Sequence, residues 1–144
     1  MQHINRYICP MKYDYSECIG SRLRKISRMV DSHFRQHLVD FDITENQMTI
    51  LFAMSKMKKV EQGRIGKYLY LEKSTVSRNI KLLEKRGFVS RSSDYRPTVE
   101  LTDEGYKMVE TLTPVWLGIM DELVGVLGSS GLDGLRNLET KMRT

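Results

Sequence analysis

Two short helical segments, joined by three residues and followed at once by a hairpin pattern, constrain the fold of this chain more than any other feature. The first segment fits residues 61–69, and the second carries apolar residues at spacings of four and three before it ends at Gly87. These apolar residues are Val76, Ile80 and Leu83. The polar turn 92–97 then separates two extended candidates, residues 88–91 and 98–101. This order of elements predicts a helix-turn-helix with a two-stranded wing.

The segment in front of this unit predicts two further helices. Thr44 and Gln47 have the spacing of a capping box that starts a helix, so the winged helix-turn-helix covers residues 44–102. A longer amphipathic helix precedes it, with an apolar stripe at spacings of three and four: Ile19, Leu23, Ile26, Val30, Phe34 and Leu38. Residues 1–15 show no clear periodicity and are interpreted as an N-terminal arm. The predicted fold class is mainly α with a small β-hairpin wing.

The segment after the hairpin predicts a long helix with a heptad-like apolar seam. Thr102 can cap this helix, and residues 128–131 (Gly-Ser-Ser-Gly) break the chain before a last helix. The seam consists of Val109, Leu112, Trp116, Ile119, Leu123 and Val126. Such a seam is what a helix–helix interface requires. We therefore expect residues 16–43 and 103–144 to form a helical region that makes a homodimer.

Charge is concentrated in the middle of the chain. Between Lys56 and Arg96 there are 12 Lys/Arg and 4 Asp/Glu, although the whole chain carries a net charge of only +5. A basic block of this kind is the electrostatic footprint of a nucleic-acid surface. A solvated lysine-rich face would give the same count, so charge alone does not decide between the two.

Composition excludes several classes of protein. Hydrophobic residues make up 40% and charged residues 28% of the chain, which is typical of a globular domain. No uncharged apolar run approaches the roughly 20 residues of a membrane span, and the N-terminus lacks the pattern of a signal peptide. The sequence shows no glycine-rich phosphate loop, nucleophile elbow or metal motif. We expect a cytoplasmic protein that is not an enzyme and has no cofactor or metal.

The leading end of the second short helix has the chemistry of a DNA-reading surface. Hydroxyls, an amide and cationic groups gather there, and all of them can bond base edges or phosphate oxygens. These residues are Lys73, Ser74, Thr75, Ser77, Arg78, Asn79 and Lys81. In the hairpin, Arg96 near the tip could enter a minor groove and Arg91 at the base could meet phosphate. We expect the helix to carry most of the specificity and the wing to clamp the DNA backbone.

These segments resemble the MarR-type transcriptional regulators. The matching stretches are Ile65-Gly66-Lys67-Tyr68-Leu69, Lys73-Ser74-Thr75-Val76-Ser77-Arg78, Leu83-Glu84-Lys85-Arg86-Gly87-Phe88-Val89-Ser90-Arg91, Asp94-Tyr95-Arg96 and Leu101-Thr102-Asp103-Glu104-Gly105. The last two are similar to the wing Asp-x-Arg of the family and to its Leu-Thr-x-x-Gly after the wing. The chain departs from the family at Gly66, where the family commonly has Ala, and in a shorter segment between Gly87 and Asp94.

The resemblance implies a homodimer that binds a palindromic duplex DNA operator. It places Ser74, Thr75, Ser77 and Arg78 at the major groove and Arg96, with Asp94 beside it, at the minor groove. It also implies a small-molecule effector, or a redox input, that alters the spacing of the two recognition helices. A repressor released by a ligand is the function that this resemblance favours.

Two alternatives remain open at the level of sequence. Some relatives sense peroxides through a cysteine near the start of the first helix, and Cys18 lies close to that place. A winged-helix module that meets a protein or RNA through its basic face is the second alternative, and loss of binding at high salt with preference for a palindromic duplex would separate it from a DNA regulator. His33 and His37, at spacing i, i+4, are interpreted as surface or dimer contacts rather than metal ligands.

Overall fold

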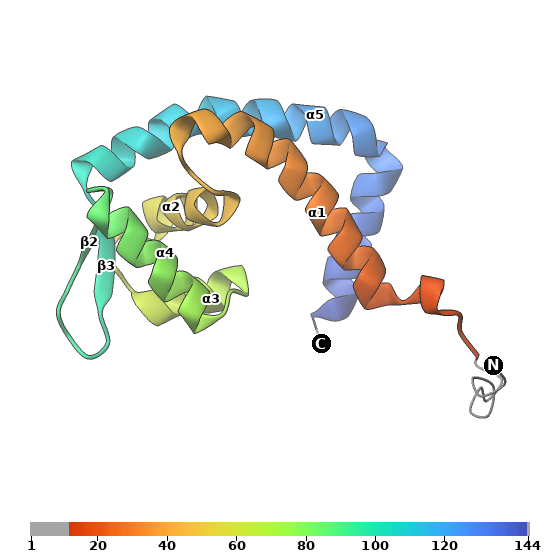
Figure 1. Ribbon diagram of the computed structural model, residues 1–144, viewed down its shortest axis with the longest axis horizontal. Helices are drawn as coiled ribbons and strands as arrows, with labels where there is room; N and C mark the ends of the chain where they lie inside the picture. Colours follow the sequence, from red (N-terminus) through yellow and green to blue (C-terminus); the bar gives the residue numbers. More distant parts are fainter. Residues whose placement is uncertain (1–11, 144) are drawn as a thin grey trace, which may run out of the picture.

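The computed structural model describes residues 12–143 and arranges them as a winged helix-turn-helix unit beneath two long helices, α1 and α5 (Figure 1). Cys9 and most of the N-terminal arm lie outside the described residues. The element order is a 3-10 turn Tyr15–Glu17, α1 Ile19–Leu38, a 3-10 turn Val39–Phe41, α2 Glu45–Met57, β1 Val60–Glu61, α3 Gln62–Leu69, α4 Lys73–Lys85, β2 Val89–Arg91, β3 Thr98–Leu101 and α5 Asp103–Met142. The mainly α fold with a small β wing is confirmed.

Helix α2 begins where the capping box predicts. The Thr44 hydroxyl accepts from the Gln47 backbone N–H at 3.2 Å, and the Gln47 side chain accepts from the Thr44 N–H at 3.1 Å. Two N–H groups that no helical carbonyl can reach are thereby satisfied. Helix α5 begins at a similar cap, in which the Thr102 hydroxyl accepts from the Gly105 N–H at 3.1 Å.

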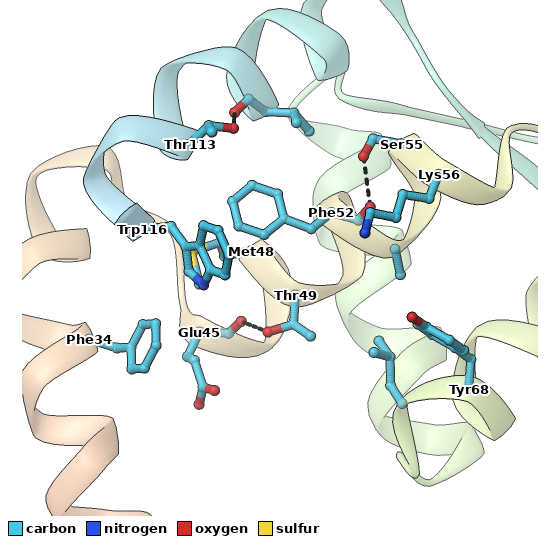
Figure 2. A pocket seen from close by; sticks show the side chains of 13 residues that line it. Phe34, Glu45, Met48, Thr49, Phe52, Ser55, Lys56, Tyr68, Thr113 and Trp116 are labelled. Carbon is cyan, nitrogen blue, oxygen red and sulfur yellow. Dashed lines mark hydrogen bonds between the residues drawn. The ribbon is translucent and has the colours of Figure 1, made fainter. Parts of the chain in front are cut away.

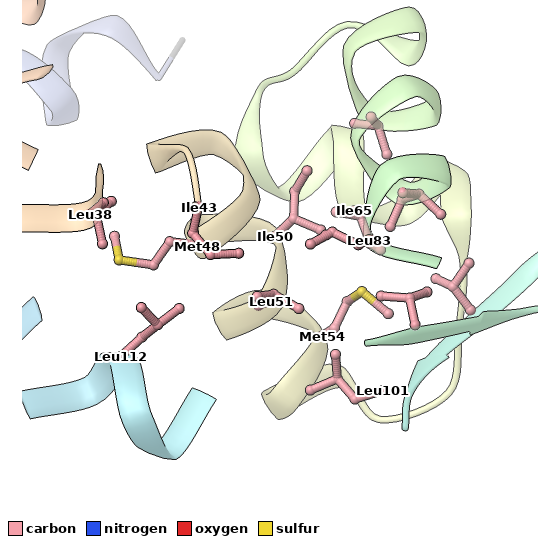
Figure 3. Packing of buried hydrophobic residues seen from close by; sticks show 14 of the residues in the cluster. Leu38, Ile43, Met48, Ile50, Leu51, Met54, Ile65, Leu83, Leu101 and Leu112 are labelled. Carbon is pink, nitrogen blue, oxygen red and sulfur yellow. The ribbon is translucent and has the colours of Figure 1, made fainter. Parts of the chain in front are cut away.

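One core holds the winged unit against the two long helices. Figure 3 shows its side chains coming from α1, α2, α4, the sheet and α5. Its fully buried members are Leu38, Ile50, Leu51, Met54, Ile65, Ile80, Leu83, Val99, Leu112 and Ile119. Burial of apolar side chains on this scale contributes roughly 1.5–3 kcal/mol for each side chain. The winged unit and the proximal part of α5 are therefore one packed body.

The wing is a hairpin that the sequence predicts, with one strand that the sequence does not reveal. Strands β2 and β3 pair antiparallel with Val89 opposite Leu101, as the extended candidates predict. The additional strand β1 pairs with β3 on its other side, with Val60 opposite Val99, so the sheet order is β1-β3-β2. A two-residue strand has no periodicity of its own, so the sequence does not predict it.

The close approach of α3 to α4 explains Gly66. A Cβ at this position would lie 3.1 Å from the Leu71 carbonyl oxygen and 3.4 Å from Cγ2 of Val76. The turn Tyr70–Glu72 folds directly against this glycine, since the Leu71 N–H donates to the Gly66 carbonyl at 2.9 Å. Gly66 thus sets the spacing between the two helices of the helix-turn-helix.

The predicted break in the last helix lies at Gly128. This residue has φ 67° and ψ −179°, so α5 consists of two helical segments that meet there, and Figure 1 shows the change of direction. A left-handed φ is accessible to glycine at little cost. The second segment therefore departs at a steep angle from the first.

The heptad-like seam of α5 packs inside the chain, which corrects the expectation that it forms the dimer interface. Leu112 and Ile119 are fully buried, and Val109, Trp116 and Leu123 pack against the same core. Only Val126 is exposed. A helical seam of this kind needs a partner helix, but the partner here is the chain's own α1 and α2.

Other apolar residues of α1 and α5 are left at the surface. On α1 they are Ile19, Leu23, Ile26 and Met29, and on α5 they are Leu117, Val124, Val126, Leu127, Leu135, Leu138 and Met142. The stripe predicted for α1 is therefore split, because Phe34 and Leu38 enter the core and its N-terminal half does not.

Helix α5 is long and apolar enough to cross a membrane by length and composition, although no uncharged run in it reaches that length. Asp121 and Glu122 interrupt its apolar stretch. Leu112 and Ile119, on the other hand, are buried against α1 and α2. These contacts pack one face of α5 on the domain core, whereas only 6% of its apolar window is buried.

Candidate nucleic-acid interface and ligand cavity

Helix α4 has one face in the core and the opposite face in solvent. Val76, Ile80 and Leu83 are buried and fix the rotation of the helix about its axis. Lys73, Ser74, Arg78 and Lys81 are exposed, and Thr75, Ser77 and Asn79 are half-buried. All seven residues predicted for this helix thus lie outside the core on one short helix, which Figure 1 shows at the edge of the unit beside the wing.

The leading end of α4 is open to a partner. Glu72 precedes the helix in an extended conformation and its side chain makes no capping hydrogen bond, so the first backbone N–H groups of α4 have no side-chain acceptor at that cap. Free N–H groups at a helix N-terminus favour an anion such as a phosphate oxygen. Asn79 is partly committed to the helix itself, because its Nδ2 donates to the Thr75 carbonyl at 2.9 Å.

The wing tip is fully exposed. Asp94, Tyr95 and Arg96 lie in the turn between β2 and β3, and Tyr95 is 99% exposed. The turn is closed at its base, where the Ser92 N–H donates to the Thr98 carbonyl at 2.9 Å and the Thr98 N–H donates to the Ser92 hydroxyl at 3.0 Å. The tip therefore projects from a fixed base, as a clamp on a DNA backbone requires.

Arg91 differs in setting from Arg96. Its Nε lies 3.8 Å from Oε1 of Glu84 on α4, and its side chain is 28% exposed. This ion pair joins the wing to α4 and balances part of the charge of Arg91. Within the described residues it is the one ion pair between positions 56 and 96, so most cations of the basic block stay unneutralised by protein carboxylates.

Sequence reasoning missed the role of Arg86. Its guanidinium donates to the Asp42 carbonyl and, at 3.2 Å, to the Phe41 carbonyl, and it lies 5.0 Å from the ring centroid of Phe88. Its partners are more than 40 residues away in sequence, so no local pattern signals them. Arg86 therefore ties the end of α4 to the turn between α1 and α2, and its charge serves the fold.

A cavity of about 490 Å³ lies between the long helices and the winged unit. Its lining comes from α1, α2, α3 and α5: Phe34, Glu45, Met48, Thr49, Phe52, Ala53, Ser55, Lys56, Tyr68, Leu69, Val109, Thr113 and Trp116 (Figure 2). Phe52 and Trp116 meet edge to face, with ring centroids 5.8 Å apart. A cavity of this size, mostly apolar with a few polar groups, is typical of a small-molecule site. No sequence motif marks it, because four separate elements build it.

Glu45 is the carboxylate of this cavity. Burial, and then the neighbouring carboxyl of Asp31 on α1, raise the pKa of Glu45 to about 7. Both effects disfavour the charged form, since burial removes water and Asp31 adds a like charge. Glu45 also lines a second cavity of about 590 Å³, which it shares with Asp31 and Arg35.

The remaining candidate residues lie away from both surfaces. Cys18 is exposed and precedes α1 as its N-cap residue. His37 reaches across to α5, where its Nε2 lies 3.3 Å from Glu122, and His33 is half-buried. In the part of the chain that the structure describes, no group of three His, Cys, Asp or Glu residues could hold a metal.

Comparison with known proteins shows which family the chain resembles. Residues 41–96, from the 3-10 turn after α1 to the wing tip, match the model of the MarR family. Over this segment the chain is similar to the MarR family. Among curated relatives, the uncharacterized HTH-type transcriptional regulator YwoH of Bacillus subtilis is 27% identical over 127 residues, which cover 86% of this chain and 85% of the relative.

Solved structures extend the likeness to the whole MarR-type chain. Bordetella bronchiseptica BpsR, whose DNA binding is regulated by 6-hydroxynicotinic acid, aligns with a TM-score of 0.83 at 25% identity over 92% of this chain and 98% of its own. Staphylococcus aureus MepR in complex with DNA aligns with a TM-score of 0.72 at 28% identity over 91% and 97%. Over most of its length the chain is thus similar to MarR-type transcriptional regulators, one of them solved in complex with DNA.

Proposed function

We propose that this protein is a homodimeric, cytoplasmic repressor of the MarR type that binds a palindromic operator and leaves it when a small molecule enters the cavity. The observation that carries the proposal is helix α4. Its apolar face is packed in the core, and its opposite face exposes Ser74, Arg78 and Lys81 to solvent. These residues belong to the basic segment 56–96, in which most cations have no carboxylate partner among the described residues. A rigid helix with polar side chains at its leading end is what major-groove reading requires.

We assign the residues as follows. Lys73, Ser74, Thr75, Ser77, Arg78, Asn79 and Lys81 face the major groove or its flanking phosphates. Arg96, with Asp94 beside it, lies at the adjacent minor groove. Arg91 contributes mainly through its contact with Glu84, which holds the wing against α4.

The exposed apolar residues of α1 and α5 support the dimer. Soluble chains rarely leave such a surface uncovered, and a second copy is the partner that a two-fold operator requires. The surface involves the N-terminal half of α1 and the part of α5 beyond Ile119, so the dimerisation region lies within residues 16–43 and 103–144. Two-fold symmetry would place the two α4 helices about 34 Å apart on successive turns of DNA.

The position of the cavity supports ligand release. It touches α1 and α5, which we assign to the dimer, and α2 and α3, which carry the recognition helix. A ligand that binds one spacing of these helices better than another shifts the population toward that spacing. The regulation of BpsR by 6-hydroxynicotinic acid is a precedent in a relative of the same fold.

Selection of duplexes from a random DNA pool with the purified full chain tests the proposal. We expect enrichment of an inverted repeat whose half-site centres are about one helical turn apart, with affinity that falls steeply with salt. Failure to enrich any duplex would favour a winged-helix module for a protein or RNA. If peroxide releases the DNA and Cys18→Ser prevents this, the thiol at the start of α1 is the input.

A further inference from the structure

The serine and threonine hydroxyl groups of the cavity already donate their protons to backbone carbonyls. Thr49 Oγ1 donates to the Glu45 carbonyl at 2.9 Å, Ser55 Oγ to the Phe52 carbonyl at 2.7 Å, and Thr113 Oγ1 to the Val109 carbonyl at 2.7 Å. Figure 2 shows these three bonds pointing back into the helices. A hydroxyl has one proton and two lone pairs. Toward a ligand, each of these oxygens can therefore only accept.

Glu45 adds a further acceptor next to aromatic walls. It lies at the first turn of α2, and in the view of Figure 2 its carboxylate lies to one side of Phe34 and below Trp116. The carboxyl has no ion-pair partner among the described residues. Asp31 stands near it as a second carboxyl and raises its pKa. A cationic ligand would relieve this like-charge repulsion, and an anionic ligand would add to it.

The cationic group of the cavity lies at its other end. Lys56 is eleven residues after Glu45 on the same helix, about 16 Å along the axis at the helical rise. Lys56 is exposed, so water screens its charge. Tyr68 on α3 is also exposed, and the part of α5 in the lining contributes no charged side chain. At the half-buried end of the cavity, the charged lining group is Glu45, and both Asp31 and Arg35 lie beyond it in the second cavity.

We propose that the cavity takes an aromatic ligand that presents hydrogen-bond donors, an arylalkylamine in its ammonium form, with its ring against Phe52 and Trp116 and its nitrogen at Glu45. The aromatic faces stabilise such a cation as well as the ring. This inference rests on the proposed function, which places the effector in this cavity. The cationic ligand proposed here differs in charge from 6-hydroxynicotinic acid, a carboxylic acid that regulates BpsR.

The test compares tyramine with 4-hydroxyphenylacetate, which share a phenol ring on a short chain and carry opposite charges. Trp116 is the only tryptophan of the chain and lines the cavity, so its fluorescence reports binding directly. At about pH 8, where Glu45 is mainly ionised, we expect tyramine to bind at least about tenfold more tightly, as for a charge-assisted hydrogen bond. In Glu45→Gln the preference should fall to about threefold or less. Glu110→Gln, an exposed carboxylate outside the lining, is the matched control and should keep it.

Equal or tighter binding of 4-hydroxyphenylacetate to the wild-type chain would overturn the proposal. So would an undiminished preference in Glu45→Gln, or the absence of any Trp116 response to either compound. The wild-type comparison stands even if the variant folds poorly. Release of labelled operator is measured separately: tyramine that binds but leaves the operator bound would contradict ligand release and leave the ligand class intact.

Discussion

Gly105 offers a sharp test of how α5 is joined to the wing. A Cβ at this position would lie 2.1 Å from the Phe88 carbonyl oxygen and 3.1 Å from the Phe88 carbonyl carbon. Both are backbone atoms, so no side chain can rotate away. In Gly105→Ala the start of α5 must move by about 1 Å from the strand that follows Phe88, because a relaxed contact is a little over 3 Å.

This displacement has a cost that can be worked from the contacts. It breaks or stretches the hydrogen bond from the Thr102 N–H to the Phe88 carbonyl, 3.1 Å long, and the bond from the Thr102 hydroxyl to the Gly87 carbonyl, 2.6 Å long. Each contributes about 1 kcal/mol, and overpacking adds about 1–3 kcal/mol. We expect Gly105→Ala to lower the free energy of unfolding by about 3–5 kcal/mol.

Urea denaturation followed by circular dichroism, at one fixed protein concentration, measures this loss. Gly118→Ala is the matched control, since it lies on the same helix with nothing within 4 Å of its Cβ. Replacing that exposed glycine should instead stabilise the helix by about 0.5–1 kcal/mol. A Gly105→Ala variant that unfolds within about 0.5 kcal/mol of the wild-type chain would refute the packing argument.

Three other predictions concern pH, assembly and the end of α4. The pKa of Glu45 rises from its ordinary 4.5 to about 7, so the folded state binds this proton more tightly than the unfolded state does. The free energy of unfolding should therefore fall as pH rises from 4.5 to 7 and then level off. In urea titrations at several pH values, Glu45→Gln should remove on the order of 1 kcal/mol of this loss. In sedimentation at micromolar concentration the wild-type chain should be a dimer, and Ile26→Glu should give monomers, because Ile26 is 55% exposed on the assigned interface; a wild-type monomer would contradict the interface. Arg86→Gln should lower the free energy of unfolding by about 1–3 kcal/mol, because it loses the hydrogen bonds to the Phe41 and Asp42 carbonyls. A change in DNA affinity with no loss of stability would instead place Arg86 at the DNA interface.

Local chemistry made much of the fold predictable. The Thr44 cap, the Gly87 stop and the two extended stretches of the wing each depend on neighbours in sequence, and the structure confirms them. The pairing of β1 with β3 joins residues about 40 positions apart, so no local pattern could reveal it. The recognition helix was predictable as an element because its buried face has helical spacing.

The α5 seam shows where periodicity stops being informative. A heptad-like pattern specifies that a helix packs on another helix, and it does not specify which helix. Leu112 and Ile119 pack in the core of the same chain. The apolar surface that remains for a second copy includes Ile26 and Val124. The cavity was unpredictable for a related reason, because its lining is gathered from four elements and only the folded chain brings them together.

The central claim is that α4 reads DNA, and Arg78 tests it most directly. Arg78 is exposed on α4, next to the half-buried Ser77 and Asn79, and its side chain makes no hydrogen bond or ion pair within the described residues, so Arg78→Ala should leave folding unchanged. In a fluorescence-anisotropy titration of the selected duplex, we expect the variant to lose about 1–3 kcal/mol of specific affinity. Binding to a scrambled duplex should weaken much less, and the matched variant Arg136→Ala at the far end of α5 should bind like wild type. Equal affinity of Arg78→Ala and wild type for the selected duplex would contradict the account.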